Sequence, residues 1–551
     1  MHKLSPRAAI TAATITLLLI GTSACAGDKS DPGNSSSPNG SPVKGGRLSI
    51  AFTSDSGCID PPQTGFIEDR IIIRQIADTL TDQDPETLEI VPYLAESWEV
   101  NDTATEYTFR LKSGVTFSDG SALDAAAVKA TFDGILELGP LATGAGRLIT
   151  GLESTEVVDP QTVVLRFSVP NAAFLQATTN ASLAILSPDS WDKAPEDRCV
   201  GDYIGSGPYT LNEYTPNESA SVDRRSGYGW ATSVAENQGE VYLDGIDFSF
   251  IAEPSVQVGS VTSGQLDIAW PRAALSEDNQ GLIQAAGGHT LSREMPGVSE
   301  TQIPNTTDGH VLSDLYARQA LVKGIDFSGI AKAEYWEGYP VPTGIVAETT
   351  PGWVDQSEAY AYDPEGAKQL LEDNGWELDA DGYYAKAGKR FTIRWLVFTN
   401  VSSESTAALV QDQLKDVGIE VEIVPLTAQD GAAVLEAGDY DIGNIASTRA
   451  DADILRQIFD LTTVADSSAA KKSQDPQTAA KLSELFALQL TQVDPTQRLQ
   501  TIAEIQELLV DQVVAFPLNA RIQVFGLAER VNDVKITAEN LTLTNDAWLS
   551  K

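Results

Sequence analysis

Apolar and polar positions recur along the chain with two different periods, and the change of period predicts which segments are strands and which are helices. Alternation at every second residue predicts strands over 46–52, 107–111, 162–167 and 241–251. Apolar residues three and four apart predict helices over 68–80, 125–136 and 255–263, the last ending at Gly264. The first half of the chain is therefore expected to be mixed α/β.

The second half carries one clear supersecondary unit. A strand over 391–398, an amphipathic helix over 404–417 that Gly418 ends, and an alternating strand over 419–424 predict a right-handed βαβ crossover. Asp363 and Pro364 stand at the N-cap and first position of another helix, which ends before Gly375. Further helices are predicted over 314–323, 477–490 and 495–510, followed by a strand over 523–527.

The amino terminus differs from the rest of the chain. A short basic start at 1–7, an apolar stretch at 8–20 and small residues up to Cys25 form the pattern of a secretory signal over 1–24. The Ser-Ala-Cys ending resembles a bacterial lipobox, in which the cysteine is lipidated, although Thr22 stands where Leu or Val is usual. Cleavage near Ala24 or Ala26 without lipidation is the alternative. Residues 26–45 are rich in Gly, Ser, Pro and Asn and are predicted to be a flexible linker.

Three cysteines occur in the chain. If Cys25 carries lipid, Cys58 and Cys199 remain, and an exported protein meets an oxidising environment. We therefore expect these two to form a disulfide. Two buried free thiols are the alternative.

The charge balance excludes two classes of partner. Asp and Glu number 78 against 37 Lys and Arg, giving a net charge of −41, while 42% of the residues are hydrophobic. This is a globular composition with an acidic surface, which disfavours binding to nucleic acid and direct adhesion to anionic lipid. No later run approaches 18 apolar residues, so no other segment is expected to enter a membrane.

Signals for catalysis and for cofactors are weak. The sequence has no His-Glu-x-x-His, no Walker loop and no Gly-x-Ser-x-Gly elbow, and only three histidines. We expect no enzyme activity, no cofactor and no dedicated metal site. Because acidic pairs are abundant, a secreted hydrolase is kept as the less favoured alternative, and an adhesion or signalling receptor that reuses the fold as another.

Several short motifs resemble one family, and they occur in the order found in that family. They are 92–100 (PYLAESWEV), 107–115 (YTFRLKSGV), 117–120 (FSDG), 205–209 (GSGPY), 263–269 (SGQLDIA), 318–321 (RQAL), 362–371 (YDPEGAKQLL) and 375–376 (GW). Together they resemble the family 5 extracellular solute-binding proteins, which are the dipeptide- and oligopeptide-type receptors of bacterial ABC importers. Most of these residues are structural in character, being turn, cap and core positions.

The resemblance implies an α/β fold of the type II periplasmic-binding-protein class, with two lobes joined by a hinge and an extra inserted domain. Lobe I would comprise 46–82, 200–305 and 515–551, the inserted domain 83–199, and lobe III 306–514. The implied function is capture of a small solute, a peptide or a peptide-like compound, and delivery to a membrane ABC permease. The protein would be a monomer, anchored through Cys25 to the outer face of the cytoplasmic membrane. Binding of a metal chelate, haem or another non-peptide solute is the alternative.

The resemblance also points to a ligand-binding segment after Tyr440-Asp441. Peptide-binding members place a Trp and an amine-binding Asp there; by register Ser447 falls near the Trp, and Ala450 or Asp451 near the Asp. Arg449 could hold a carboxylate while Asp451 or Asp453 holds an amine, and an exposed loop with internal ion pairs is the alternative.

Four further residues complete the predicted ligand-binding set, and they come from the same segment and from other strand ends. Trp270 is equally consistent with a core position. These residues are Thr448, Trp270, Asn305 and Asp60.

Overall fold

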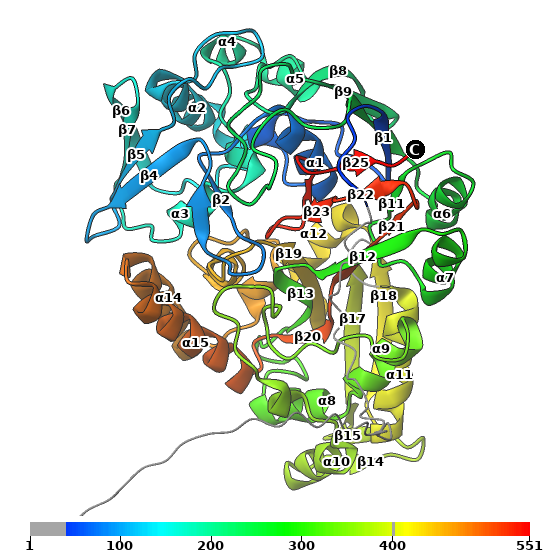
Figure 1. Cartoon of the computed structure of the whole chain (residues 1–551). Coiled ribbons are helices and arrows are strands. Elements are labelled where there is room, and N and C mark those ends of the chain that lie inside the picture. Colours follow the sequence, from blue (N-terminus) through cyan, green and yellow to red (C-terminus); the bar gives the residue numbers. More distant parts are fainter. Residues whose placement is uncertain (1–39, 399–402) are drawn as a thin grey trace, which may run out of the picture. The chain divides into compact units, whose positions relative to one another are not determined.

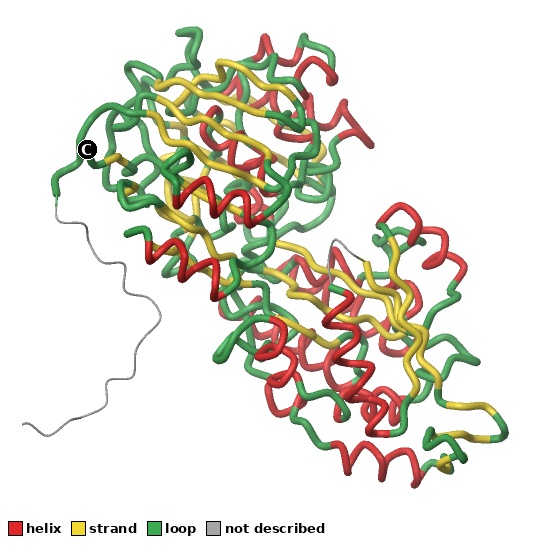
Figure 2. The backbone as a smooth tube through the Cα atoms, turned by 90° about the vertical axis from the view of Figure 1, so that its right-hand side faces the viewer, coloured by secondary structure: helices red, strands yellow, loops and turns green. Residues whose placement is uncertain are grey.

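The computed structural model describes residues 40–398 and 403–551, and 41–551 form one compact unit. The predicted signal, Cys25 and most of the linker lie outside the described residues, so the predictions for them stay predictions. Within the described chain, strands and helices pack together throughout, as expected for a mixed α/β protein (Figures 1 and 2).

The largest sheet has seven strands in the order β12-β21-β11-β1-β10-β9-β8. Its central strand β1 pairs in parallel with both β10 and β11, and the outer pairings are antiparallel. Ile50 and Phe52 of β1 are fully buried in the main core of this sheet. Its strands are β1 Arg47–Phe52, β8 Tyr209–Thr215, β9 Ser219–Arg224, β10 Gly245–Phe250, β11 Ile268–Trp270, β12 His289–Glu294 and β21 Ile522–Leu527.

A four-stranded antiparallel sheet has the order β4-β5-β7-β6. Helix α2 (Ala125–Leu138) begins after Asp124, whose side chain accepts the backbone N–H groups of Ala126 and Ala127. Buried Phe109, Phe132 and Phe174 fill the core between this helix and the sheet. The strands are β4 Ala95–Val100, β5 Glu106–Leu111, β6 Leu152–Asp159 and β7 Thr162–Phe167.

The third sheet has five strands and contains the predicted crossover. Its order is β18-β17-β19-β13-β20. Strands β17 and β18 are parallel and are connected through α11 (Glu404–Val417), so the strand–helix–strand prediction is confirmed. Ser403 caps the start of α11, and Gly418 ends it at a φ of +86°. The strands are β13 Gly297–Pro304, β17 Thr392–Phe398, β18 Glu420–Leu426, β19 Ile442–Thr448 and β20 Phe516–Asn519.

The remaining elements are shorter strands and the other helices. The strands are β2 Thr81–Gln83, β3 Ile90–Pro92, β14 Glu377–Leu378, β15 Tyr384–Lys386, β16 Lys389–Arg390, β22 Val531–Asn532, β23 Lys535–Ile536, β24 Thr542–Leu543 and β25 Trp548–Leu549. The helices are α1 Ile67–Ile76, α3 Phe174–Ala177, α4 Pro188–Trp191, α5 Pro195–Cys199, α6 Pro254–Thr262, α7 Glu277–Ala285, α8 Leu315–Lys323, α9 Phe327–Glu334, α10 Pro364–Asp373, α12 Ala428–Ala437, α13 Ile454–Phe459, α14 Pro476–Thr491 and α15 Pro495–Asp511.

Two strands that lie within the predicted bounds of lobe I pair in the five-stranded sheet and not in the seven-stranded one. Strands β13 and β20 were both assigned to lobe I by the predicted boundaries, but they pair in the five-stranded sheet. The reason is that the chain changes sheets at these points, just after β12 and just before β21. The pairing of β13 and β20 is a property of the sheets, and the predicted division into lobes stays a prediction.

The two changes of sheet lie side by side. The chain leaves β12 for β13 through Met295-Pro296, and it leaves β20 for β21 through Ala520-Arg521. The backbone N–H of Met295 donates to the carbonyl oxygen of Arg521 at 2.8 Å, which ties the two connections together. A pair of short connections of this kind is the arrangement in which a hinge motion can be absorbed by few residues.

The predicted disulfide is confirmed. Cys58 and Cys199 are bonded, with their Cα atoms 4.2 Å apart across a sequence separation of 141 residues. The backbone N–H of Ile59 also donates to the carbonyl oxygen of Cys199 at 2.9 Å. The bond therefore fastens the segment after β1 to the end of α5.

The Gly-Ser-Gly-Pro turn at 205–208 shows why two glycines are needed. A Cβ on Gly205 would lie 2.2 Å from the carbonyl oxygen of Ile76, and a Cβ on Gly207 would lie 2.5 Å from that of Gln75. The turn passes directly against the end of α1, and any larger residue would force it away.

Candidate ligand-binding site

A cavity of about 290 Å³ lies where the seven-stranded and five-stranded sheets meet. It is bounded by Trp270 at the end of β11, by the last residues of β19, and by Met295 and Arg521 of the two connections between the sheets. Its wall is completed by the start of α1. The lining residues are Gly65, Phe66, Ile67, Glu68, Arg70, Trp270, Arg272, Met295, Ala446, Ser447, Thr448, Arg521 and Gln523.

Helix α1 brings an acidic side chain to this cavity in its first turn, where a helix favours negative charge. The Glu68 side chain is only 2% exposed and accepts from Nε and Nη2 of Arg272 at 3.1 and 3.0 Å. The Arg272 guanidinium also lies over the ring of Phe66, 5.2 Å from its centroid. Glu68 and Arg272 therefore form a neutral pair on one side of the cavity.

Arg521 approaches the cavity from the connection between β20 and β21. Its Nη1 donates to Thr448 Oγ1 at 3.1 Å, which joins the connection to the end of β19. Burial lowers the pKa of Arg521 from its ordinary value, because desolvation penalises the cation. The guanidinium stays charged, since an arginine pKa lies far above neutral pH.

Three of the predicted ligand-binding residues line this cavity: Ser447, Thr448 and Trp270. Ser447 and Thr448 belong to β19 itself and not to a loop after it. Trp270 is 1% exposed and packs against Phe52 and Phe525, with ring centroids 5.8 and 3.6 Å away. Trp270 is therefore a core residue that also closes the wall of the cavity.

The segment predicted to bind the ligand forms a buried ion-pair network in this structure. Asp453 accepts from Arg449 at 2.9 Å and from Arg456 at 2.7 Å, and Asp451 accepts from Arg498 at 2.6 Å. Burial alone would raise the pKa of Asp453, but the guanidinium groups of Arg456 and Arg449 lower it to about 2. Arg449, Asp451 and Asp453 are absent from the cavity lining, and each already has a partner of opposite charge.

Asn305 and Asp60 also lie away from the cavity. Asn305 is fully buried and donates to the carbonyl oxygens of Gly438 and Tyr440 at 3.3 and 3.0 Å, which fixes the turn that leads into β19. Asp60 is fully buried beside the disulfide and accepts from Arg198 Nε at 3.2 Å. Both side chains stabilise the fold around the site.

Sequence reasoning missed Glu68, Arg272, Met295 and Arg521. No local signal marks them, since each resembles many other charged or apolar residues in the chain. They become a site only because the fold brings the start of α1, the end of β11 and both connections together.

A second cavity, of about 630 Å³, is lined by residues of β19 and by segments on either side of it in the chain. Arg147 and Thr150 line it from the segment before β6, while Arg456, Gln457 and the loop 463–468 line it from the region of α13. Ala446 and Ser447 line both cavities, so the end of β19 is their shared wall.

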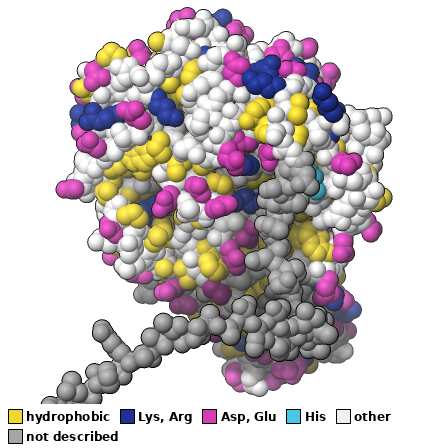
Figure 3. All heavy atoms as spheres, viewed as in Figure 1, with side chains coloured by type: hydrophobic (Ala, Val, Ile, Leu, Met, Phe, Trp, Pro, Cys, Tyr) yellow, Lys and Arg dark blue, Asp and Glu magenta, His cyan; other side chains and the backbone are white. Residues whose placement is uncertain are grey.

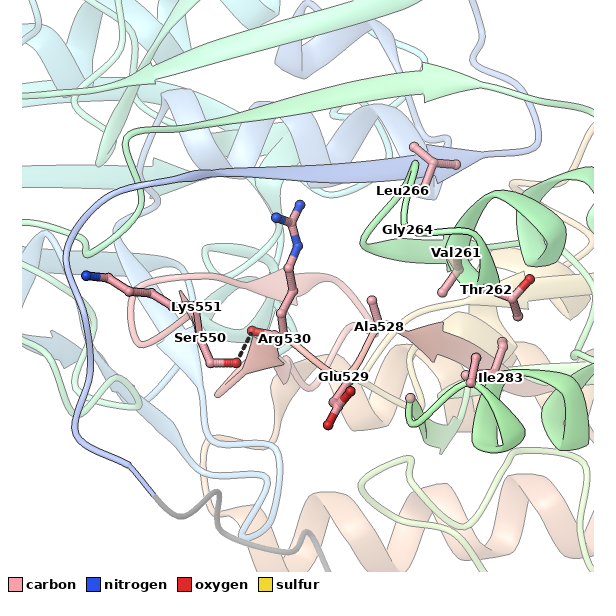
Figure 4. Close-up of a pocket in the computed structure, with 12 residues that line it drawn as sticks. Val261, Thr262, Gly264, Leu266, Ile283, Ala528, Glu529, Arg530, Ser550 and Lys551 are labelled. Atoms are coloured by element: carbon pink, nitrogen blue, oxygen red, sulfur yellow. Dashed lines mark hydrogen bonds between the residues drawn. The ribbon is translucent and has the colours of Figure 1, made fainter.

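A third cavity, of about 390 Å³, lies near the carboxyl terminus (Figure 4). Its residues come from α6, α7 and the segment after β21, all around the seven-stranded sheet. Arg530 is already paired there with Asp267 at 2.5 Å, and Ser550 donates to the Arg530 carbonyl oxygen at 3.4 Å. Because it contacts one sheet only, hinge motion would not open or close it.

Among residues 40–398 and 403–551, no helix is long and apolar enough to cross a bilayer. Within the same described ranges, no cluster of three or more His, Cys, Asp or Glu is placed to hold a metal ion. On the face shown in Figure 3, acidic side chains are spread widely, with basic side chains in small groups among them.

Comparison with known proteins places this geometry in a family. The family model for bacterial extracellular solute-binding proteins, family 5, matches residues 89–460. The glutathione-binding protein GsiB of Salmonella paratyphi A is 27% identical over 393 residues, covering 70% of this chain and 71% of that protein. GsiB of Escherichia coli K12 is 25% identical over 394 residues, with the same coverage.

Solved structures show the same fold at lower identity. NikA from Brucella suis, in complex with Fe(III)-EDTA, superposes with a TM-score of 0.80 at 22% identity, covering 92% of this chain and 100% of NikA. The oligopeptide-binding protein AppA from Bacillus subtilis, in complex with a nonapeptide, gives a TM-score of 0.72 at 19% identity, covering 93% of this chain and 100% of AppA.

The predicted fold class, a type II periplasmic-binding-protein architecture, is thereby confirmed, and so is the predicted family. The family match extends well past half of the chain, and the resemblance found in the short motifs agrees with it. The chain belongs to the family 5 bacterial extracellular solute-binding proteins, the ligand-capturing components of ABC importers.

Proposed function

We propose that this protein captures a small peptide or peptide-like solute in the cavity between the seven-stranded and five-stranded sheets and delivers it to a membrane permease. The observation that carries the proposal is the position of the cavity, which touches both sheets and both connections between them. A ligand held there would contact both lobes at once, so its binding would favour the closed arrangement.

The size and lining of the cavity suit such a solute. A volume of about 290 Å³ matches a small molecule, and the second cavity adjoins it at Ala446 and Ser447 for a longer one. Backbone groups at the end of β19 and the charged groups of Glu68, Arg272 and Arg521 offer the mixed polar contacts that a zwitterion needs. The protein would release its ligand chemically unchanged.

The predicted membrane anchor is part of the same proposal. Cys25 would carry the lipid, and residues 26–45 would hold the folded unit away from the bilayer. An acidic surface would give the protein no membrane affinity of its own, so attachment depends on the acyl chains. The Cys25→Ser variant should move from the detergent phase to the aqueous phase in a Triton X-114 partition, while the wild-type protein stays in the detergent phase.

The test of ligand capture uses the full protein purified from its own host. Native mass spectrometry should show a bound small molecule, and isothermal titration calorimetry should then measure its binding together with that of glutathione and of a mixed dipeptide pool. Release of the ligand in altered form, or turnover of an ester or glycoside, would contradict the proposal.

A metal chelate is the second candidate, and one observation favours it. Three arginines, Arg70, Arg272 and Arg521, line the same cavity, and guanidinium groups bind polycarboxylates well. Titration with Fe(III)-EDTA in the same calorimeter separates the two candidates. Tighter binding of Fe(III)-EDTA than of the dipeptides is the result expected for a receptor of metal chelates, and not for a receptor of peptides.

A further inference from the structure

Buried arginines in this protein are matched with partners almost everywhere. Arg70, Arg74, Arg198 and Arg498 each lie within 3.2 Å of a carboxylate oxygen, from Glu539, Asp82, Asp60 and Asp451. Arg318 instead donates to backbone carbonyl oxygens, those of Leu312, Ser313 and Gln512. The general pattern is that an inward-facing guanidinium has its N–H groups taken up by anions or carbonyls.

Arg521 departs from this pattern. Its side chain donates one hydrogen bond to a neutral hydroxyl, Thr448 Oγ1, although a guanidinium carries five N–H groups. In the described part of the chain, no carboxylate lies within ion-pair distance of it. The charge of Glu300, on the five-stranded sheet, acts to raise the pKa of Arg521 from beyond that distance, and this carboxylate accepts from Asn519 Nδ2 at 3.0 Å.

The charges around the cavity do not cancel. Arg70 is neutralised by Glu539 and Arg272 by Glu68, so each of those arginines belongs to a balanced pair. Arg521 then adds one positive charge that no lining residue offsets. Leaving a half-buried cation uncompensated costs free energy, and a chain with 78 acidic residues would have many ways to supply a partner.

We infer that Arg521 is the anchor for a carboxylate of the captured solute, which makes the ligand an organic acid and not a neutral or purely cationic compound. Thr448 holds one edge of the guanidinium, and the remaining N–H groups are available for the two oxygens of a carboxylate. The inference rests on the proposed function, because it assigns the chemistry of the same cavity.

The position of Arg521 gives this contact a second consequence. Its backbone carbonyl oxygen accepts from Met295 N–H at 2.8 Å, so the residue is part of the paired connections between the sheets. Its side chain reaches β19 of one sheet, while the chain continues from it into β21 of the other sheet. A carboxylate bound there would neutralise charge at the point where the lobes are joined, and it would strengthen the closed arrangement.

The experiment compares two probes that differ only in the carboxylate. Isothermal titration calorimetry is run with a mixed dipeptide pool and with the same pool carrying carboxyl-terminal amides. The proteins are the wild type, Arg521→Gln, Arg521→Lys and Arg110→Gln. Arg110 is the matched control, because it carries the same charge on an exposed strand, 3.5 Å from Glu99. Thermal melting of each variant confirms that it is folded.

The expected result is that the wild type binds the free-acid pool and that amidation or Arg521→Gln weakens binding by about 30-fold or more. Arg521→Lys should recover part of the affinity, since lysine restores the positive charge without the planar guanidinium that donates two parallel hydrogen bonds to a carboxylate. Arg110→Gln should leave the affinity unchanged. Equal binding of the two pools, or an Arg521→Gln variant with wild-type affinity, would overturn the inference while leaving peptide capture intact.

A wild type that binds neither pool would refute the peptide proposal, and a separate measurement then decides the role of Arg521. Malonate and malonamide are compared for their effect on the melting temperature of the wild type and of Arg521→Gln. A stabilisation by malonate that is specific to the wild type supports the carboxylate anchor. An equal response of both proteins overturns it.

Discussion

Asp453 tests whether the charged segment after β19 stabilises the fold or contacts the ligand. Its carboxylate accepts from Arg449 and Arg456 and also from Gln489 Nε2 at 2.7 Å, and its side chain is 1% exposed. In the Asp453→Asn variant two guanidinium groups would lose their anion without gaining access to water.

The magnitude follows from the burial and from the pKa. Removing one partner of a buried ion pair costs about 3–5 kcal/mol. For a chain of this length that unfolds as one unit, the melting temperature should fall by about 3–5 °C. The lowering of the pKa of Asp453 from 3.8 to about 2 corresponds by itself to about 2 kcal/mol of the free energy of unfolding. This contribution is present above pH 4 and is lost as the pH falls towards 2. The difference in stability between the variant and the wild type should therefore become smaller in acid.

The assay is thermal unfolding followed by circular dichroism, together with calorimetric titration of the dipeptide pool. Asp133→Asn is the control, since Asp133 forms an exposed pair with Lys129 at 2.6 Å, worth only about 0.3–0.5 kcal/mol. An unchanged melting temperature together with lost peptide binding would refute the reasoning. That result would make Asp453 a ligand-contacting residue, as the sequence predicted.

Three other predictions concern stability. Reduction of the Cys58–Cys199 bond, which spans 141 residues, should destabilise the protein by about 5 kcal/mol in the chain-entropy model, seen as a lower melting temperature with dithiothreitol. Gly207→Ala should lower the melting temperature or prevent folding, because its Cβ would lie 2.5 Å from a backbone oxygen, whereas Gly259→Ala within α6 meets no atom within 4 Å and should be neutral or stabilising. Burial and a neighbouring carboxylate raise the pKa of Glu294 from 4.5 to about 7. Its contribution of about 3 kcal/mol to the free energy of unfolding is therefore present in acid and lost as the pH rises through that range. The free energy of unfolding of Glu294→Gln, measured by urea titration, should not show this loss as the pH rises. A variant whose stability depends on pH as that of the wild type does would contradict the prediction.

The elements of the fold were predictable where the local signals agree. Helix α11 begins and ends at the predicted residues, because Ser403 supplies the cap, Gly418 supplies a left-handed ending, and the apolar stripe between them has a helical period. The disulfide was predictable from the cysteine count and the export signal together. The family was predictable because turn and cap residues such as Asp363 and Gly207 are constrained by backbone geometry, which sequence motifs record.

The candidate site was predictable only in part. Ser447, Thr448 and Trp270 were predicted because they stand at strand ends, and they line the cavity, while their contact with a ligand stays a prediction. Arg449 and Asp453 were expected to meet a ligand, yet the fold brings Gln176 and Gln489 from distant segments to complete their hydrogen bonds. A charged side chain has the same local signature whether it is paired internally or left for a solute.

The sequence by itself determined many of the helices and strands, the disulfide and the family, because these depend on periodicity, caps and backbone constraints that neighbouring residues carry. Only the tertiary structure decided which charges are satisfied within the protein. Glu68, Arg272 and Arg521 are separated by hundreds of residues, and they line one cavity because the fold brings the start of α1, the segment after β11 and the connection between β20 and β21 together. The physical reason is that the energy of a charge depends on what lies within a few ångströms of it, and that distance is set by the fold and not by the sequence interval.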